Sequence, residues 1–265
     1  ALIDQGPTGG TCLNSGCVPS KALLRAARLA GEARRAADLG LVRLDGDARP
    51  DFGAVMARVR GLRAQIAVHD SAQRLRDLGV DVFLGQGRFL DRHALEVNGQ
   101  RLEFAKAVIA TGSRPGGLPF PGLKEAGYLT NQTFFNLTAL PARLAVLGTG
   151  PIGCELAQAL ARLGSRVLMV GRSDQIMTRE DPDAAAVVAE ALMADGVDLR
   201  LGASVTQVEV RDGEKIIHLA RGGQSEAVAV DQILVGAGRT PNLEGLGLEA
   251  AGVAAEAKTG VKVDD

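Results

Sequence analysis

Two cysteines five residues apart stand near the start of the chain, in the segment GGTCLNSGCVPSK at residues 9–21. On an ideal helix, Cα atoms at this spacing lie about 8.7 Å apart, whereas a disulfide requires about 4.4–6.8 Å. Cys12 and Cys17 can therefore form a bridge only where the backbone departs from an ideal helix, as Gly16 and Pro19 allow. Such a bridge is expected to be easily reduced, as catalytic disulfides are. Two buried structural thiols are the alternative.

Pro19 indicates that a helix begins near Cys17, and a helix N-terminus stabilises a thiolate. Lys21 follows Cys17 by four residues, so a helical turn would bring its ammonium to the same face. Cys154 lies at an apolar helix start and is expected to be a small core residue. The three histidines have no metal-ligand spacing, so we expect no metal site and place all three on the surface: His69, His93 and His218.

A glycine-rich motif lies between a predicted strand at 144–147 and a predicted helix at 151–163. Its first glycine permits a tight turn, its second lets a pyrophosphate approach the backbone, and its third packs helix against strand. The helix N-terminus would face the phosphates. We therefore predict a dinucleotide site, with a glycine-rich turn that binds nothing as the alternative. The motif consists of Gly148, Thr149, Gly150, Pro151, Ile152 and Gly153.

The end of the next predicted strand, at 167–170, indicates which nucleotide binds. An Asp or Glu there would accept hydrogen bonds from the ribose 2′-hydroxyl of NAD. Gly171 and Arg172 stand there instead, and Arg179 follows seven residues later. Guanidinium groups without a carboxylate suit a 2′-phosphate, so the sequence favours NADPH over NADH. Arginines that are merely solvated are the alternative.

The apolar spacing predicts the elements that position these motifs. In the first half we expect helices to about residue 39 and at 51–78, strands at 80–84 and 107–110, and a hairpin turn at Asn98-Gly99. A Gly/Pro-rich segment at 116–121 is the candidate connection between domains. Beyond it, strands and helices alternate, which predicts a parallel sheet covered by helices. These elements are strands at 144–147, 167–170 and 197–201, helices at 151–163 and 183–195, and short strands over 205–220 and at 233–235.

Composition narrows the function further. The chain has 265 residues, of which 46% are hydrophobic, and this apolar fraction suffices for a core. Its net charge of −1 argues against nucleic-acid binding. With no Trp and one Tyr, the sequence offers no platform for base stacking. No apolar run approaches the ~18 residues of a membrane helix, so no membrane partner is expected. Three cysteines are too few for a secreted disulfide framework, which favours a cytoplasmic location.

The segments GGTCLNSGCVPSK, ATGSRP, GTGPIGCE and GAGRTPN together resemble the class I flavin-dependent pyridine nucleotide-disulfide oxidoreductases. Within this family the most similar branch is that of the mercuric reductases, and the segments that carry this similarity are 122–125, 130–131, 156–165 and 179–182. An NAD-dependent dihydrolipoyl dehydrogenase is the alternative enzyme. The resemblance implies an α/β fold with two Rossmann-like domains and an antiparallel β-meander. Residues 1–121 would form a partial FAD-binding domain, 122–245 an NAD(P)-binding domain, and 246–265 the return to the FAD domain.

The resemblance also implies an electron path. NADPH would reduce FAD, which would reduce a Cys12–Cys17 disulfide, and the electrons would pass on to a thiol/disulfide or metal-ion (mercuric) substrate. Cys17 would face the flavin and Cys12 would meet the substrate. Lys21 would lie near the flavin and pair with Glu155.

The same resemblance assigns the cofactor contacts. Asp4 would hold the ribose of the FAD adenosine, and Pro151 replaces a Tyr that covers the nicotinamide pocket in several relatives. The other positions expected to line FAD are Gly10, Thr11, Lys21, Gly87, Ala110, Thr111 and Gly112. Those expected to line the pyridine nucleotide are Gly148, Gly150, Pro151, Ile152, Gly153, Arg172, Arg179, Val205 and Gly238.

Two parts of the family pattern lie outside the sequence. The first strand–GxGxxG–helix, which holds the FAD pyrophosphate, would precede Ala1, and a dimerisation domain would follow Asp265. We therefore expect the chain to be the middle of a longer homodimeric enzyme and to bind FAD poorly by itself. A catalytically inert nucleotide-binding fragment is the alternative from another functional class.

Overall fold

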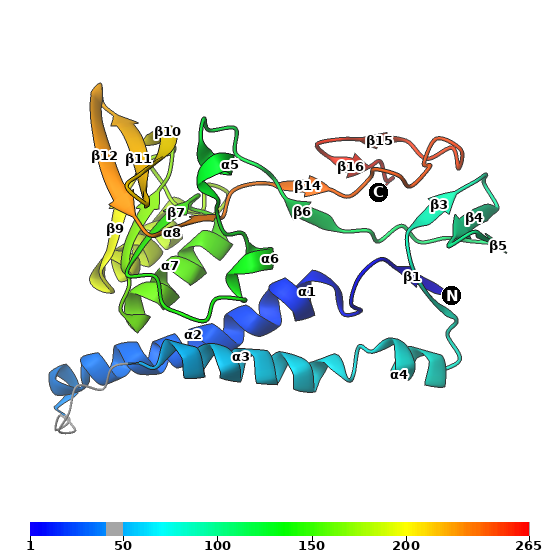
Figure 1. The fold of residues 1–265 in the computed structure, drawn as a ribbon, viewed down its shortest axis with the longest axis horizontal. Helices are drawn as coiled ribbons and strands as arrows, with labels where there is room; N and C mark the ends of the chain where they lie inside the picture. Colours follow the sequence, from blue (N-terminus) through cyan, green and yellow to red (C-terminus); the bar gives the residue numbers. More distant parts are fainter. Residues whose placement is uncertain (41–49, 265) are drawn as a thin grey trace. The chain divides into compact units, whose positions relative to one another are not determined.

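The computed structural model describes residues 1–40 and 50–264, and the chain forms two compact units (Figure 1). The first comprises residues 1–14, 63–116 and 239–265, and the second 15–62 and 117–238. After residues 63–116 of the first unit, the chain returns to the second unit at Gly117, within the Gly/Pro-rich segment. Residues 15–40 and 50–62 pack with the unit that carries the glycine-rich motif. The domain boundaries expected from the family resemblance stay a prediction.

A four-stranded parallel sheet forms the centre of the second unit. Its strands run in the order β13-β7-β8-β9, and these are Gln232–Val235, Arg143–Leu147, Arg166–Val170 and Val197–Arg200. Helix α7 (Pro151–Leu163) connects β7 to β8, and α8 (Pro182–Ala194) connects β8 to β9. After a polar first residue, β7, β8 and β13 are continuous runs of Val, Leu, Ile, Ala and Met because helices and further strands cover both faces of the sheet. The predicted parallel sheet is confirmed.

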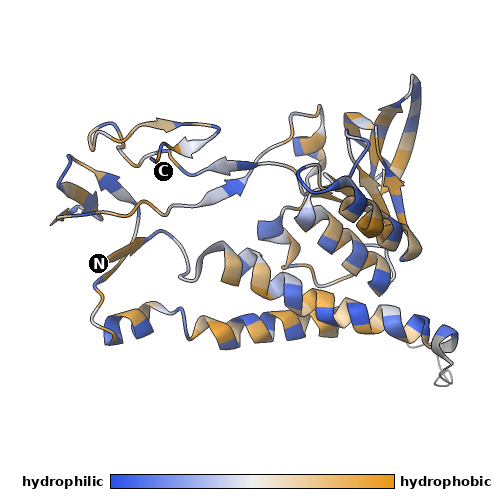
Figure 2. Ribbon diagram, turned by 180° about the vertical axis from the view of Figure 1, so that it is seen from behind, coloured by the Kyte–Doolittle hydropathy of each residue, from blue (hydrophilic) through white to orange (hydrophobic). Residues whose placement is uncertain are grey.

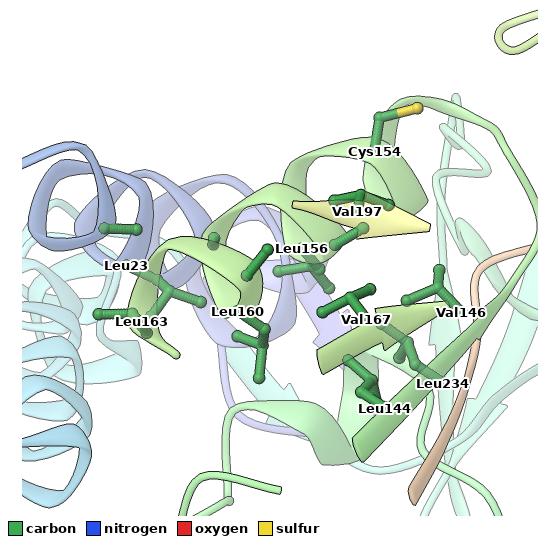
Figure 3. Packing of buried hydrophobic residues seen from close by; sticks show 14 of the residues in the cluster. Leu23, Leu144, Val146, Cys154, Leu156, Leu160, Leu163, Val167, Val197 and Leu234 are labelled. Carbon is green, nitrogen blue, oxygen red and sulfur yellow. The ribbon is translucent and has the colours of Figure 1, made fainter. Parts of the chain in front are cut away.

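Local sequence fixes both ends of α7. Pro151 occupies the first helical position, where a missing N–H costs nothing. Gly164 ends the helix in the left-handed conformation, with φ +112°, which favours glycine. Between these ends, leucines at helical spacing project from α7 towards the strands and towards Leu23 of α2 (Cys17–Arg34), as Figure 3 shows. The labelled leucines of α7 are Leu156, Leu160 and Leu163.

Two hydrophobic cores lie on opposite faces of the parallel sheet. The first joins α7 and α8 to α2, to α3 (Phe52–Ala67) and to α6 (Asn131–Phe134). The second joins the sheet to α5 (Leu123–Ala126) and to an antiparallel meander. The meander consists of β10 (Ser204–Arg211), β11 (Glu214–Arg221) and β12 (Gln224–Val230). Strand β12 was not predicted from the sequence, because its first three residues, Gln-Ser-Glu, are polar and exposed.

The first unit contains short elements. Strands β1 (Leu2–Asp4) and β2 (Val82–Leu84) pair in parallel. The antiparallel strands β3 (Gly87–Phe89), β4 (Ala94–Val97) and β5 (Gln100–Glu103) include the predicted Asn98-Gly99 turn, in which both residues have positive φ. The remaining strand pairs are β6 (Ser113–Pro115) with β14 (Arg239–Pro241), and β15 (Ala255–Glu256) with β16 (Gly260–Val261). The remaining short helices are α1 (Gly10–Ser15), α4 (Ala72–Asp77) and the 3₁₀ helix η1 (Ala36–Leu39), which lies in the second unit.

Two predicted elements are wrong. Residues 107–110 form no strand, and Val108 is 92% exposed, because none of the described strands pairs with this apolar run. The helix predicted at 51–78 is two helices: α3 ends at Ala67, and the Ser71 side chain accepts a hydrogen bond from Arg74 N–H to start α4.

Hydrophobic and hydrophilic residues alternate along both α2 and α3 (Figure 2), as expected for helices with one buried face. No helix in the described part of the chain has the length and apolar character needed to cross a membrane.

Candidate functional site

The glycine-rich turn packs at backbone contact distance against its neighbours. Gly148, directly after β7, has φ +117°, and a Cβ there would lie 2.9 Å from the Ala237 Cβ and 3.0 Å from the Ala237 nitrogen. A Cβ on Gly153 would lie 2.3 Å from the Gly148 carbonyl oxygen. Any side chain at either position would separate β7, α7 and the segment that follows β13. The tight turn predicted at Gly148 and the helix–strand packing predicted at Gly153 are therefore both present.

The turn stands where the strand order of the sheet reverses. From β7 the chain proceeds to β8 on one side, whereas β13 pairs with β7 on the other. In open α/β sheets, ligands bind at this carboxyl edge. The first-turn amides of Ile152 and Gly153 have no carbonyl partner within α7, as in every helix, and Ile152 is exposed. The turn and the helix N-terminus thus fit a pyrophosphate.

A loop anchored to the turn carries the two arginines. Arg172 and Arg179 are both exposed and follow β8. Met177 N–H, between them, donates a 2.8 Å hydrogen bond to the Thr149 carbonyl. The end of β8 carries no carboxylate, and the exposed guanidinium groups lie on the loop that the turn holds. This arrangement is compatible with a phosphate on the ribose.

Two further predicted nucleotide contacts differ in their surroundings. Val205 is buried in the core beside the meander, so only its main-chain atoms are left for a ligand. Gly238 is exposed, with φ +72°, and a Cβ there would meet no atom within 4 Å.

The helix containing the cysteines is interrupted at Gly16. Helix α1 ends at Ser15, Gly16 has φ −134° and ψ −116°, and α2 begins with Cys17. The backbone therefore departs from an ideal helix between Cys12 and Cys17, as a bridge requires. Both cysteines are exposed, which contradicts the alternative of two buried structural thiols. The bridge itself stays a prediction.

Two asparagines brace the cysteine segment, each within its own unit. In the first, Asn14 Nδ2 donates to the carbonyls of Pro7, Thr8 and Gly10 at 3.3, 3.1 and 2.9 Å. In the second, the buried Asn131 donates a 3.0 Å hydrogen bond to the carbonyl of Ser15, the last residue of α1. Neither asparagine was predicted from the sequence, because spacing along the chain does not show which polar side chains reach distant carbonyls.

Lys21 and Glu155 form an ion pair between α2 and α7. Their side chains are 61% and 34% exposed, so the pair is accessible to solvent. Lys21 lies one helical turn after Cys17, and Glu155 lies two residues after the last glycine of the motif. The pair therefore ties the helix that begins at Cys17 to the helix that begins at the glycine-rich turn.

The residues expected to contact FAD lie in the first unit, apart from Lys21. Asp4 is the last residue of β1, and its carboxylate accepts a 3.1 Å hydrogen bond from Gly6 N–H, which orients the carboxylate. Dinucleotide-binding folds bind a ribose at such a strand end. Gly10 and Thr11 open α1, and Gly87 opens β3. The predicted contacts at Ala110, Thr111 and Gly112 are all exposed.

Side-chain hydrogen bonds join the ATGSRP and GAGRTPN segments within the first unit. The Thr111 hydroxyl donates to the Asn242 carbonyl at 2.8 Å, and Asn242 Nδ2 donates to the Thr111 carbonyl at 2.9 Å. Arg114 forms a two-point pair with Glu244 at 2.6 and 2.9 Å, which lowers the pKa of the Glu244 carboxyl to about 2. Two motifs that are distant in sequence are thus held together.

Cys154 is predicted to resist alkylation in the folded protein. Burial raises its pKa to about 11, and its Sγ contacts the Thr149 carbonyl at 3.6 Å, so the predicted core position is confirmed. Because the folded pKa exceeds the ordinary value of 9.0, the associated stability is present below about pH 9 and is lost as the pH rises through 11. At pH 8, iodoacetamide should label Cys12 and Cys17 of the reduced protein, and Cys154 only in denaturant. Equal labelling rates for all three in the native state would contradict this burial.

The second unit has the dinucleotide-binding α/β fold, with its glycine-rich turn at the reversal of strand order. A model of the pyridine nucleotide-disulphide oxidoreductase family matches residues 1–265, and the chain belongs to this family.

Several characterised proteins are similar to the chain. It is 36% identical over 262 residues to the mercuric reductase of Staphylococcus aureus, covering 99% of this chain and 47% of that protein. It is 33% identical over 257 residues to the dihydrolipoyl dehydrogenase of Bacillus subtilis (strain 168), covering 95% of this chain and 55% of that protein. The chain thus spans about half the length of these relatives.

A solved structure extends the comparison to the fold. The HOCl-induced flavoprotein disulfide reductase RclA from Escherichia coli superposes with a TM-score of 0.84 at 30% identity, covering 99% of this chain and 56% of that one.

Proposed function

We propose that the protein is an NADPH-dependent flavoprotein reductase that transfers electrons through a Cys12–Cys17 disulfide to a disulfide or metal-ion substrate. The interruption of the helix between two exposed cysteines carries this proposal, since it makes a bridge at a five-residue spacing possible. Family membership and the similarity to mercuric reductases support it. FAD, when bound, would carry two electrons from the nicotinamide to the disulfide.

The chain's own residues would bind and orient the reactants. The turn at 148–153 would hold the pyrophosphate of NADPH, and Arg172 and Arg179 would meet its 2′-phosphate. Lys21 and Glu155 would fix the start of α2, and with it Cys17, relative to α7. Asp4 would bind a ribose of FAD.

The redox balance is simple. One hydride equivalent from NADPH and one proton from solvent break the S–S bond and give two thiols and NADP⁺. The two thiols can then reduce a substrate disulfide, which re-forms the Cys12–Cys17 bond, or give two electrons and two protons while a bound divalent metal ion is reduced to the metal.

Calorimetry with NADP⁺ and NAD⁺ tests the nucleotide assignment. We expect NADP⁺ to bind at least about tenfold tighter, because two guanidinium groups are available to the 2′-phosphate. Arg172→Ala and Arg179→Ala should weaken NADP⁺ binding and leave NAD⁺ binding nearly unchanged. Arg221→Ala, at the exposed hairpin between β11 and β12, is the matched control and should change neither. Tighter binding of NAD⁺ would favour the dihydrolipoyl dehydrogenase alternative.

A further inference from the structure

We propose that Thr149 contributes to the choice of pyridine nucleotide by occupying the space that an acidic side chain at position 171 would need. The proposal rests on the function proposed above and deepens it. Thr149 lies between the first two glycines of the motif. The known roles of this motif belong to its three glycines and to the acidic residue at the end of the next strand, and none belongs to the residue at this position.

The observation is a steric conflict at the end of β8. A Cβ on Gly171 would lie 2.6 Å from Thr149 Cγ2, 2.9 Å from Thr149 Oγ1 and 3.3 Å from Leu201 Cδ2. The first two distances are shorter than carbon–carbon and carbon–oxygen contacts in proteins allow. Position 171 accepts a side chain only if Gly171 or Thr149 moves.

Gly171 is held on both sides by the main chain. Its N–H donates to the Arg200 carbonyl at 2.9 Å, and its carbonyl accepts from Ala203 N–H at 3.0 Å. Both partners belong to the end of β9 and the segment after it. A retreat from Thr149 would therefore break hydrogen bonds that continue the sheet.

Thr149 is held as well. Its carbonyl accepts the Met177 N–H at 2.8 Å, and the residues before and after it are Gly148, packed against Ala237, and Gly150, the N-cap of α7. Both branches of its side chain face position 171, so a rotation about χ1 leaves at least one of them there. Removal of these branches is the direct way to make room.

The consequence concerns which ribose the site accepts. A carboxylate at the end of this strand is the group that binds the 2′-hydroxyl of NAD. With Thr149 in place that carboxylate is excluded, and the arginines of the following loop remain as the groups able to meet the ribose. The preference for NADPH would thus arise partly because Thr149 sterically excludes the carboxylate that would bind NAD. Conversion to NAD⁺ binding would then require substitution at both positions.

A double-mutant cycle measures the coupling without any nucleotide. We expect Gly171→Ala alone to lower the thermal unfolding midpoint by about 3 °C or more, as overpacking does. In the Thr149→Ala background the same substitution should lower the midpoint by less than about 1 °C. Thr178→Ala, in the exposed loop after β8, is the matched control background and should give no relief. Equal shifts in the wild-type and Thr149→Ala backgrounds would overturn the proposal.

Calorimetry then tests the effect on binding, with NADP⁺ and NAD⁺ as probes. Thr149→Ala/Gly171→Glu should bind NAD⁺ at least about tenfold tighter than Gly171→Glu alone. A Gly171→Glu variant that is fully stable and gains NAD⁺ affinity by itself would overturn the proposal. If wild-type protein bound neither nucleotide, the proposed function would fail, whereas the unfolding cycle would still decide whether Thr149 and position 171 conflict.

Discussion

Gly153→Ala is expected to weaken NADP⁺ binding at least about tenfold and to lower the free energy of unfolding by about 1–3 kcal/mol. The added methyl carbon would lie 2.3 Å from the Gly148 carbonyl oxygen and 3.3 Å from Met169 Cε. The first contact is with backbone, so α7 must move away from β7, and its N-terminus moves with it. Urea denaturation gives the stability, and calorimetry gives the affinity.

Gly61→Ala provides the matched control, because it is the same substitution within a helix. A Cβ at Gly61 of α3 meets no atom within 4 Å. It should therefore stabilise the protein by about 0.5–1 kcal/mol through the lower entropy of the unfolded chain. A Gly153→Ala protein with wild-type stability and affinity would show that the close approach of helix and turn has no role in nucleotide binding.

Cys17→Ser should reduce NADPH-dependent reduction of a disulfide substrate by at least about 10³-fold in the protein expressed from its complete reading frame. A hydroxyl cannot form the S–S bond through which the electrons pass, and loss of a group that forms the covalent intermediate removes most of catalysis. Steady-state turnover measures the effect. Nucleotide binding should persist, because the turn at 148–153 does not involve Cys17.

Cys154→Ala is the matched control for the cysteine substitution. Its thiol is buried and its raised pKa keeps it protonated, so it is unsuited to thiol–disulfide exchange. We expect turnover within about threefold of wild type. Full activity of Cys17→Ser, or its loss in Cys154→Ala alone, would assign the redox chemistry to another residue.

The parallel sheet of the second unit and its helix α7 were predictable because their sequence signals are local and agree with one another. The apolar runs of β7 and β8, Pro151 at the start of α7 and Gly164 at its end all favour the observed structure, and the helix bounds match the prediction. The turn role of Gly148 and the packing role of Gly153 could be assigned in advance because the strand–turn–helix context restricts where these glycines lie.

Features that depend on tertiary partners were not predictable. The apolar run at 107–110 was expected to be a buried strand, yet the described strands provide it no neighbour. The hydrogen bond from Asn131 to the Ser15 carbonyl joins residues 116 positions apart, and no spacing rule predicts it. The conflict between Thr149 and position 171 is of the same kind, since it arises only when β8 packs beside the turn that follows β7. The Lys21–Glu155 pair was expected only through the family resemblance.

The most direct test of the electron path counts thiols before and after reduction by NADPH. The FAD-containing protein, expressed from its complete reading frame and oxidised, is incubated anaerobically with one equivalent of NADPH, alkylated at pH 8 and analysed by peptide mass spectrometry. We predict that the labelling of Cys12 and Cys17 rises together with NADPH and that Cys154 stays unlabelled. Labelling of Cys12 and Cys17 that does not depend on NADPH would contradict the proposed path.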